Sequence, residues 1–352
     1  MPALVTGDFS PLAFSELPGF AADDHAEAFA VFQRSCAAIA ECRAPLREAI
    51  APSPALVAIC RRALALRPPG RIEARRFFEA HFRPFRAKPA QGAAAAGGFF
   101  TGYYEPVVEG SLTRTDAFTA PILSPPADLA ARGAHARAAI EAGALGGSAH
   151  PIVWLRDPIE VFMIQVQGSA RVRLADGRLL RLVYAGRNGW PYASIGRILI
   201  ESGAIAPDEM SLAALKALVR AQGQAAGEAG AALMQRNESY VFFRLDAALD
   251  AQAGPIGGAG LSLTPLRSLA VDRNIHPYGT PIWIDADIPW RSPAPTPFRR
   301  LMIAQDTGSA IIGPARADIF FGFGDAAGAR AGGVRHAGEF VVFLPIEEGS
   351  VR

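Results

Sequence analysis

Three aspartates in the C-terminal part of the chain have the setting that acid–base chemistry requires. Asp272 follows the apolar run Leu-Ala-Val, Asp306 follows Met-Ile-Ala-Gln, and Asp318 precedes Ile-Phe-Phe. Apolar surroundings disfavour the charged form of a carboxyl group, and a second carboxylate nearby acts in the same direction. Cleavage of a glycosidic bond needs such an acid, because the leaving oxygen must be protonated as the sugar ring becomes positive. Aspartates at strand ends more often cap turns, and this alternative applies to each residue taken singly.

Two other motifs suggest different chemistry and are weaker. Asp306-Thr-Gly-Ser309 matches the aspartic proteases, but that mechanism needs a second copy or a homodimer, and the chain has no second copy. Gly322-Phe-Gly-Asp-Ala-Ala-Gly328 is similar to a dinucleotide-binding loop. Too little chain follows it for a βαβ unit and further strands, so we interpret these glycines as turn residues.

The cysteines and histidines do not indicate a metal site. Cys36, Cys42 and Cys60 lack zinc-ligand spacing, and the 6 histidines form no i, i+4 pair. We expect the cysteines to be small buried residues on N-terminal helices. One disulfide is compatible with an oxidising compartment, but the sequence does not select its pair.

Length and composition limit the class of protein. The 352 residues suffice for about two domains, and 50% of them are hydrophobic. Charged residues make up 19%, the net charge is +2, and no run is rich in Lys or Arg. A nucleic-acid partner is therefore not expected, whereas an uncharged or weakly anionic polymer is.

The elements that must position the aspartates change in type along the chain. Helical spacing of apolar residues predicts helices over residues 26–50, 55–66 and 72–82, with Pro45 dividing the first. Residues 90–98 form an Ala/Gly linker. Short apolar runs then indicate strands over residues 99–106, 161–174, 178–184, 240–243, 268–271, 280–284, 301–304, 319–321 and 340–344.

Residues 161–174 and 178–184 are joined by Asp176-Gly177, which is typical of a β-hairpin. Residues 195–202 and 212–222 have helical patterns. Many short strands at close spacing favour a barrel or sandwich. The sequence thus predicts a mainly β protein with helices at its N-terminus and in its middle.

Several blocks resemble a known family. Ser268–Phe343 resembles the 3D domain, a double-psi β-barrel with three aspartates. Phe100–Val108, Phe162–Ser169 and Tyr184–Gly196 are similar to the membrane-bound lytic murein transglycosylase A family and its MltA-specific insert domain. The resemblance runs from about Phe99 to Leu344 in the family's order.

The resemblance implies a fold and a domain order. A double-psi β-barrel (3D) domain would carry an inserted second β-barrel-like domain, and a groove between them would hold the glycan. Residues 1–106 would contain the N-terminal helices and the first part of the barrel. Residues 107–239 would form the insert, and residues 240–352 the 3D domain that completes the barrel.

The resemblance also implies a reaction and its residues. Asp318 maps onto the family's catalytic acid/base and Asp306 onto its catalytic neighbour. The substrate-binding residues would be Tyr103, Gln167, Gly168, Ser169, Asp272, Thr307 and Gly308. Cleavage between N-acetylmuramic acid and N-acetylglucosamine would give a 1,6-anhydro product, because the muramoyl C6 hydroxyl replaces water as the nucleophile. No metal or organic cofactor is needed for this reaction.

Other side chains are weaker candidates for contacts with the glycan. Tyr104, Trp190 and Trp283 have rings that suit stacking on sugars, although packing in a core is the commoner role. Arg171, Arg187 and Arg330 suit the carboxylates of stem peptides, although solvated surface arginines are commoner.

The N-terminal segment and the family resemblance lead to different expectations about localisation. The segment Met1–Asp8 contains no basic stretch followed by an apolar one, and no lipobox is visible, so the printed sequence indicates no export signal. Members of the family are typically outer-membrane lipoproteins, which implies the periplasm or the periplasmic face of the outer membrane. We expect a monomer that binds peptidoglycan strands. Three alternatives stay open at this point: a double-psi barrel that binds peptidoglycan without cleaving it, hydrolysis by water, and exo- or endo-action.

Overall fold

The chain folds into two compact units in a computed structural model. The structure describes residues 9–89, 97–129, 135–207, 209–246 and 253–347. The first unit comprises residues 1–103, 256–322 and 330–352, and the second comprises residues 104–255 and 323–329. The predicted linker at residues 90–98 lies mostly outside the described residues.

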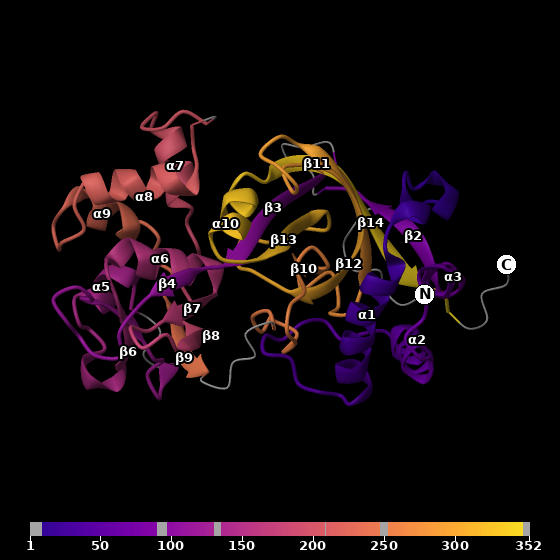
Figure 1. The fold of residues 1–352 in the computed structure, drawn as a ribbon, viewed down its shortest axis with the longest axis horizontal. Helices are drawn as coiled ribbons and strands as arrows, with labels where there is room; N and C mark the ends of the chain where they lie inside the picture. The colour runs from indigo at the N-terminus through magenta and orange to yellow at the C-terminus, as the bar shows by residue number, and fades with distance from the viewer. Residues whose placement is uncertain (1–8, 90–96, 130–134, 208, 247–252, 348–352) are drawn as a thin grey trace. The chain divides into compact units, whose positions relative to one another are not determined.

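The first unit contains a closed β-barrel (Figure 1). Within the described residues its strands are β3 (Gly98–Glu105), β10 (Ser268–Val271), β11 (Pro281–Ile288), β12 (Thr296–Asp306), β13 (Arg316–Phe323) and β14 (Arg335–Pro345). They follow the order β14-β11-β12-β10-β13-β3, and β3 pairs again with β14. This second pairing closes the ring, so the barrel has no free edge between these strands. Two further strands, β1 (Phe9–Pro11) and β2 (Phe82–Ala87), extend the sheet beyond β14.

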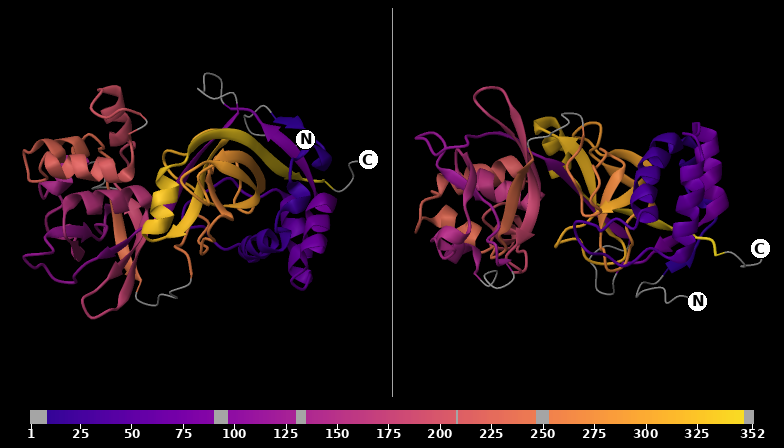
Figure 2. Two further views of the ribbon diagram at one scale, coloured as in Figure 1. Left: turned by 45° about the horizontal axis from the view of Figure 1, so that its top comes forward. Right: turned by 90° about the horizontal axis from the view of Figure 1, so that it is seen from below.

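The N-terminal helices pack beside this barrel (Figure 2). They are α1 (His25–Ala40), α2 (Pro54–Ala65) and α3 (Arg71–His81), preceded by the 3-10 turns η1 (Phe14–Glu16) and η2 (Phe20–Ala22). Their apolar faces share one core with barrel side chains, among them Trp283, Leu301 and Phe343. The helices predicted near residues 55–66 and 72–82 are therefore confirmed.

The first helix is shorter than its predicted span of residues 26–50. It ends at Ala40, and Cys42 adopts a left-handed conformation with φ of 52°. The Arg43 N–H then bonds to the carbonyl of Ala38 and closes the helix end. Pro45 lies beyond this point, so it follows the helix rather than dividing it.

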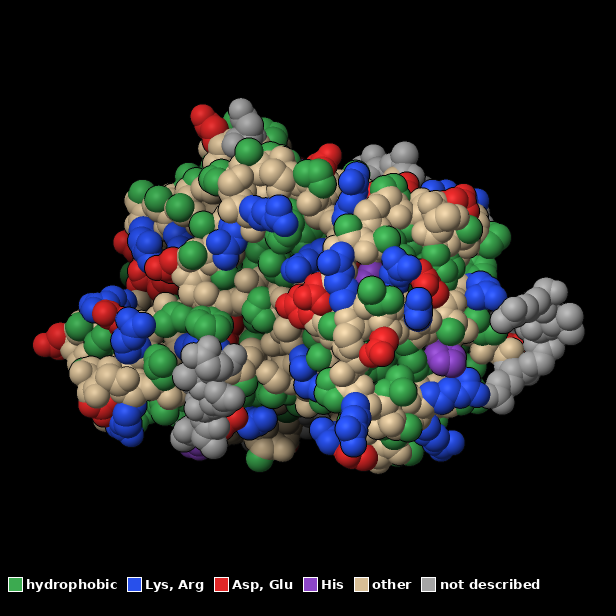
Figure 3. Space-filling view, turned by 45° about the vertical axis from the view of Figure 1, so that its right-hand side comes forward, with side chains coloured by type: hydrophobic (Ala, Val, Ile, Leu, Met, Phe, Trp, Pro, Cys, Tyr) green, Lys and Arg blue, Asp and Glu red, His purple; other side chains and the backbone are tan. Residues whose placement is uncertain are grey.

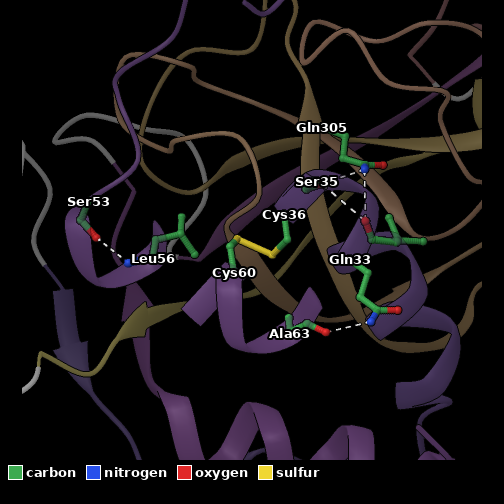
Figure 4. The surroundings of a disulfide bond; sticks show 9 residues. Gln33, Ser35, Cys36, Ser53, Leu56, Cys60, Ala63 and Gln305 are labelled. Atoms are coloured by element: carbon green, nitrogen blue, oxygen red, sulfur yellow. Dashed lines mark hydrogen bonds between the residues drawn. A yellow bond between two sulfur atoms is a disulfide. The ribbon is translucent and has the colours of Figure 1, made fainter. Parts of the chain in front are cut away.

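A disulfide joins Cys36 on α1 to Cys60 on α2 (Figure 4). Both cysteines are fully buried, and Cys42 is exposed and free. Close by, the Gln33 side chain donates to the carbonyl of Ala63 at 2.8 Å. Cys36 and Cys60 are thus buried on helices as expected, Cys42 is not, and the packing of α1 on α2 selects the disulfide pair that the sequence left open.

The second unit combines sheets with helices. In the described part of the chain one sheet has the order β4 (Val107–Glu109), β7 (Ser169–Arg173), β8 (Leu179–Arg187), β9 (Val241–Asp246), and another pairs β5 (Ala120–Leu123) with β6 (Pro151–Leu155). The helices are α5 (Arg137–Glu141), α6 (Pro158–Gln167), α7 (Ile195–Glu201), α8 (Leu212–Ala221) and α9 (Ala229–Gln235), with the 3-10 turn η3 (Gly146–Ser148). Helix α10 (Asp325–Gly332) follows β13. Strand β9 pairs with β8, so the sheet of this unit continues past residue 239, where the insert is predicted to end.

The strand predicted over residues 161–174 is wrong in its first half. Residues Pro158–Gln167 form α6, whose N-cap Asp157 accepts the N–H of Glu160 and whose first residue is a proline. Helix formation is favoured by this Asp-Pro start, which outweighs the β-branched residues that follow. The predicted hairpin is confirmed, since β7 and β8 pair antiparallel across Asp176-Gly177 with φ of 84° at the glycine.

The predicted fold class, mainly β with a barrel domain and N-terminal helices, is confirmed. In the described residues no helix has the length and apolar character needed to span a bilayer. On the face shown in Figure 3, basic and acidic side chains are interspersed, as the small net charge leads one to expect.

Candidate active site

Strand register in the first unit brings Asp306 and Asp318 close together. Ala270 on β10 pairs with Asp306 of β12 on one side and with Asp318 of β13 on the other. Side chains at the same level of adjacent strands share a face of the sheet, so both carboxyl groups project from the same side. Two strand spacings separate their Cα atoms, which is about 10 Å.

Asp318 has the environment of a carboxylic acid that retains its proton. It is partly exposed, and its Oδ1 accepts a hydrogen bond from Thr101 Oγ1 of β3 at 2.8 Å. Desolvation raises the pKa of Asp318 to about 6, and the Asp306 carboxylate adds to the rise. The Arg316 charge and the Thr101 hydroxyl act against this rise, because both favour the ionised form. The side chain is thus accessible and still partly protonated near neutral pH.

Asp306 is held by three donors. Its Oδ1 accepts the N–H groups of Gly258 at 2.7 Å and Thr307 at 2.8 Å, and its Oδ2 accepts the Tyr103 hydroxyl at 2.8 Å. Burial, and next the Asp306 charge, raise the pKa of Tyr103 well above its usual value, so the hydroxyl keeps its proton and donates it. The Tyr103 ring lies 5.3 Å from the ring of Phe320, centroid to centroid. These contacts fix Asp306 as a neighbouring acceptor, not as a mobile base.

The other predicted residues of the first unit shape the loops around this pair. Asp272 is buried, with one oxygen accepting the N–H of Asn274 at 3.0 Å and the other that of Gly313 at 2.9 Å. Thr307 is buried and donates its hydroxyl to the carbonyl of Val271 at 2.9 Å, whereas Gly308 is partly exposed. Asp272 and Thr307 therefore bind backbone in this structure, and their contact with substrate stays a prediction.

Gln167, Gly168 and Ser169 form the junction between α6 and β7 in the second unit. The Gln167 side-chain oxygen accepts the N–H of Tyr104 at 3.1 Å, and Gly168 ends the helix with φ of 83°. Ser169 is buried and begins β7. Their predicted contact with glycan stays a prediction.

A buried charge cluster in the second unit changes the interpretation of Arg171. Glu105 is completely buried and binds Arg171 Nε and Arg181 Nε, each at 2.7 Å. Both guanidinium groups also donate to the carbonyl of Ala253, and Arg171 lies over the ring of Phe323 at 3.6 Å. Arg171 is thus a structural residue, and the proposed contact with stem peptides is wrong for it.

The aromatic residues considered for stacking on sugars differ in their exposure. Trp283 has no exposed surface and lies in the core between the barrel and the N-terminal helices, so it does not stack on a sugar. Tyr104 is buried, and a Cβ on Gly328 would come within 2.7 Å of its ring, so packing also accounts for this residue. Trp190 is partly exposed.

Sequence reasoning missed Thr101, Arg316 and Arg47. Thr101 precedes Tyr103 by two residues on the strand predicted over residues 99–106, so the strand period of two could have placed it on the same face. Arg316 precedes Asp318 by two residues on the observed β13, but the strand predicted over residues 319–321 began after both. Arg47 donates from Nη1 to the carbonyl of Thr307 at 2.6 Å, and its backbone N–H bonds to Gly258. No pattern in the sequence links Arg47 to the loop after β12.

Comparisons with known proteins identify the family of this chain. The family model of the MltA specific insert domain matches residues 99–244, and that of the 3D domain matches residues 267–344. The crystal structure of a membrane-bound lytic murein transglycosylase from Agrobacterium tumefaciens has a TM-score of 0.83 and 32% identity, over 96% of this chain and 98% of that chain. The chain belongs to the membrane-bound lytic murein transglycosylase A family.

Other relatives extend the comparison. The membrane-bound lytic murein transglycosylase A of Vibrio cholerae is 36% identical over 245 residues, which is 68% of this chain. The match spans 63% of that protein, less than two thirds of its length. The structure of Escherichia coli MltA with bound chitohexaose has a TM-score of 0.71 and 27% identity, over 98% of this chain and 97% of that chain. The predicted family is confirmed.

Proposed function

We propose that this protein is a peptidoglycan lytic transglycosylase with Asp318 as its acid and base. The observation that carries the proposal is a carboxyl group, partly exposed at the barrel surface, whose pKa is raised to about 6 by desolvation. A protein that only binds glycan has no need of an acid in such a setting. The alternative of a non-catalytic peptidoglycan-binding barrel is therefore not favoured.

The proposed reaction uses one carboxyl group twice. Protonated Asp318 gives its proton to the oxygen between N-acetylmuramic acid and N-acetylglucosamine, and the bond from this oxygen to C1 breaks. The sugar passes through an oxocarbenium-like state. The carboxylate then takes the proton of the muramoyl C6 hydroxyl, whose oxygen bonds to C1 and forms the 1,6-anhydro ring. Asp318 ends the cycle protonated, as it began.

The state of Asp306 supports this mechanism over hydrolysis. Ordinary glycosidases need a second free carboxylate as nucleophile or as base for water. Asp306 is the nearby carboxylate here, and it already accepts hydrogen bonds from Gly258, Thr307 and Tyr103. A nucleophile supplied by the substrate removes the need for that second group.

We also propose peptidoglycan as the substrate and the periplasmic face of the outer membrane as the location. The relatives are named membrane-bound murein transglycosylases, and the Escherichia coli relative was solved with bound chitohexaose. A buried disulfide between Cys36 and Cys60 is in keeping with an oxidising compartment.

The test is the conversion of purified sacculi by the full chain and by Asp318→Asn. We expect the protein to release muropeptides that end in 1,6-anhydro-N-acetylmuramic acid, and Asp318→Asn to lose at least about 100-fold of this rate because general acid catalysis is removed. Asp287→Asn, which changes an exposed aspartate on β11, is the matched control and should behave as the unmodified protein. Reducing-end products would indicate hydrolysis instead, and intact sacculi would indicate a binder.

A further inference from the structure

A chain of two hydrogen bonds runs along the barrel wall to Asp318. Arg316 and Asp318 lie two residues apart on β13, so both side chains project from the same face. Thr101, on the adjacent strand β3, lies between them. Arg316 Nη2 donates to Thr101 Oγ1 at 2.8 Å, and Thr101 Oγ1 donates to Asp318 Oδ1 at 2.8 Å.

The chemistry of these groups allows only one direction of donation. A guanidinium group has donors and no acceptor, whereas a threonine hydroxyl has one proton and two lone pairs. Because Arg316 uses a lone pair of Thr101, the hydroxyl proton stays directed at Asp318. Arg316 is itself held in place, since Nη1 donates to the carbonyl of Ala317 and the guanidinium lies 5.3 Å from the Phe99 ring centroid.

We propose that Arg316 is a positioning residue, which holds the Thr101 hydroxyl as a permanent donor to Asp318 Oδ1 and so leaves Oδ2 as the oxygen that carries the acidic proton. The proposal rests on the function assigned to Asp318 above and makes it more specific. One carboxyl oxygen is anchored to the barrel, and the other is directed to the glycosidic oxygen and afterwards to the C6 hydroxyl.

Other charged groups act on Asp318 and must be separated from this effect. Asp306 of β12 faces it and favours the protonated form, and Tyr103 of β3 lies close enough for Asp318 to help raise its pKa. The charge of Arg47, which lies in the segment before α2, lowers the pKa of Tyr103. Arg335, opposite Thr101 on β14, is exposed. Arg316 also attracts the carboxylate directly through its charge, so the experiment must distinguish charge from orientation.

A double-mutant cycle read by the titration of the Asp318 carboxyl carbon makes this distinction. The probe is the carbon-13 signal of aspartate carboxyls in the labelled full chain, assigned by its absence in Asp318→Asn. We expect Thr101→Val and Arg316→Met each to raise the pKa of Asp318 by about one unit, because each removes support for the ionised form. If Arg316 acts through Thr101, its substitution shifts the pKa much less in the Thr101→Val background.

Equal shifts from Arg316→Met in both backgrounds would overturn the proposal, because Arg316 would then act by charge alone. Thr101→Ser keeps the hydroxyl and should titrate as the unmodified protein does; a shift as large as that of Thr101→Val would also count against the hydrogen-bond chain. The titration needs no substrate. Failure of the proposed function, seen as sacculi that yield no anhydro products, is therefore distinguished from failure of the positioning role.

Discussion

At the scale of single residues, opposing electrostatic effects set the protonation state of Asp318. Desolvation and the Asp306 charge favour protonated Asp318, and Arg316 and Thr101 favour the carboxylate. The outcome, a pKa of about 6, suits the proposed role of a group that both gives and takes a proton. A fully paired carboxylate would already be ionised at neutral pH and would have no proton to give, and a carboxyl group with a much higher pKa would be too weak an acid.

The rate of anhydro-product formation should therefore depend on pH through Asp318. The protonated form is the active one in the free enzyme, so kcat/KM should be constant below about pH 6 and fall about tenfold per pH unit above it. Initial rates on solubilised glycan strands across this range measure the effect. A profile that instead rises through pH 6 would mean that the ionised form starts the reaction.

At the scale of elements, contacts between segments distant in the sequence hold the scaffold. The disulfide between α1 and α2 links helices whose apolar faces cover the barrel, and Gln305 at the end of β12 donates to Ser35 of α1 at 2.8 Å (Figure 4).

Glycines act locally: Gly322 and Gly324 have φ of 107° and 77° where β13 turns into α10. These positive φ angles account for Gly322 and Gly324 as turn residues, and the Tyr104 ring leaves no room for a Cβ at Gly328.

Loss of the disulfide should destabilise the first unit. The bridge spans a sequence separation of 24 residues, and in Cys36→Ala/Cys60→Ala the unfolded chain gains the entropy of that loop, which costs about 3 kcal/mol of unfolding free energy. Urea unfolding under non-reducing conditions measures the change. The control Cys42→Ser alters the exposed free cysteine and should stay within about 0.5 kcal/mol of the unmodified protein. Unchanged stability of the double variant would show that the bridge is not formed in solution.

At the scale of the whole molecule, the raised pKa of Asp318, the proposed acid, lowers the stability of the fold at neutral pH. The pKa of Asp318 is about 6 in the folded chain and about 4 for an unfolded aspartate. The folded state thus binds more protons between these values, and stability falls as the pH rises from about 4 to 6. The loss is about 3 kcal/mol once the carboxyl is ionised in both states.

Asp318→Asn should remove this loss of folding stability and should also remove the activity. At neutral pH the variant should be more stable than the unmodified protein by up to about 3 kcal/mol, and below about pH 4 the two should match. Unfolding in urea at both pH values measures the difference. Equal stability at both would mean that the folded protein does not raise the pKa of Asp318.

The sequence by itself determined the strands around the aspartates, the N-terminal helices and the family, because these depend on local period, turn residues and blocks of motif. It also singled out Asp318 and Asp306. It misjudged residues 161–167, where a helix cap outweighed β-branched composition, and Arg171, whose burial no local pattern reports.

Only the tertiary structure decided which groups meet. The register of β10 with β12 and β13 places the two carboxyl groups on one face, and barrel closure places Thr101 of β3 beside Asp318. The pairing of Cys36 with Cys60 and the raised pKa of Asp318 depend on the same long-range packing. Periodicity specifies a face of a strand, but the neighbours across that face are set by the whole barrel.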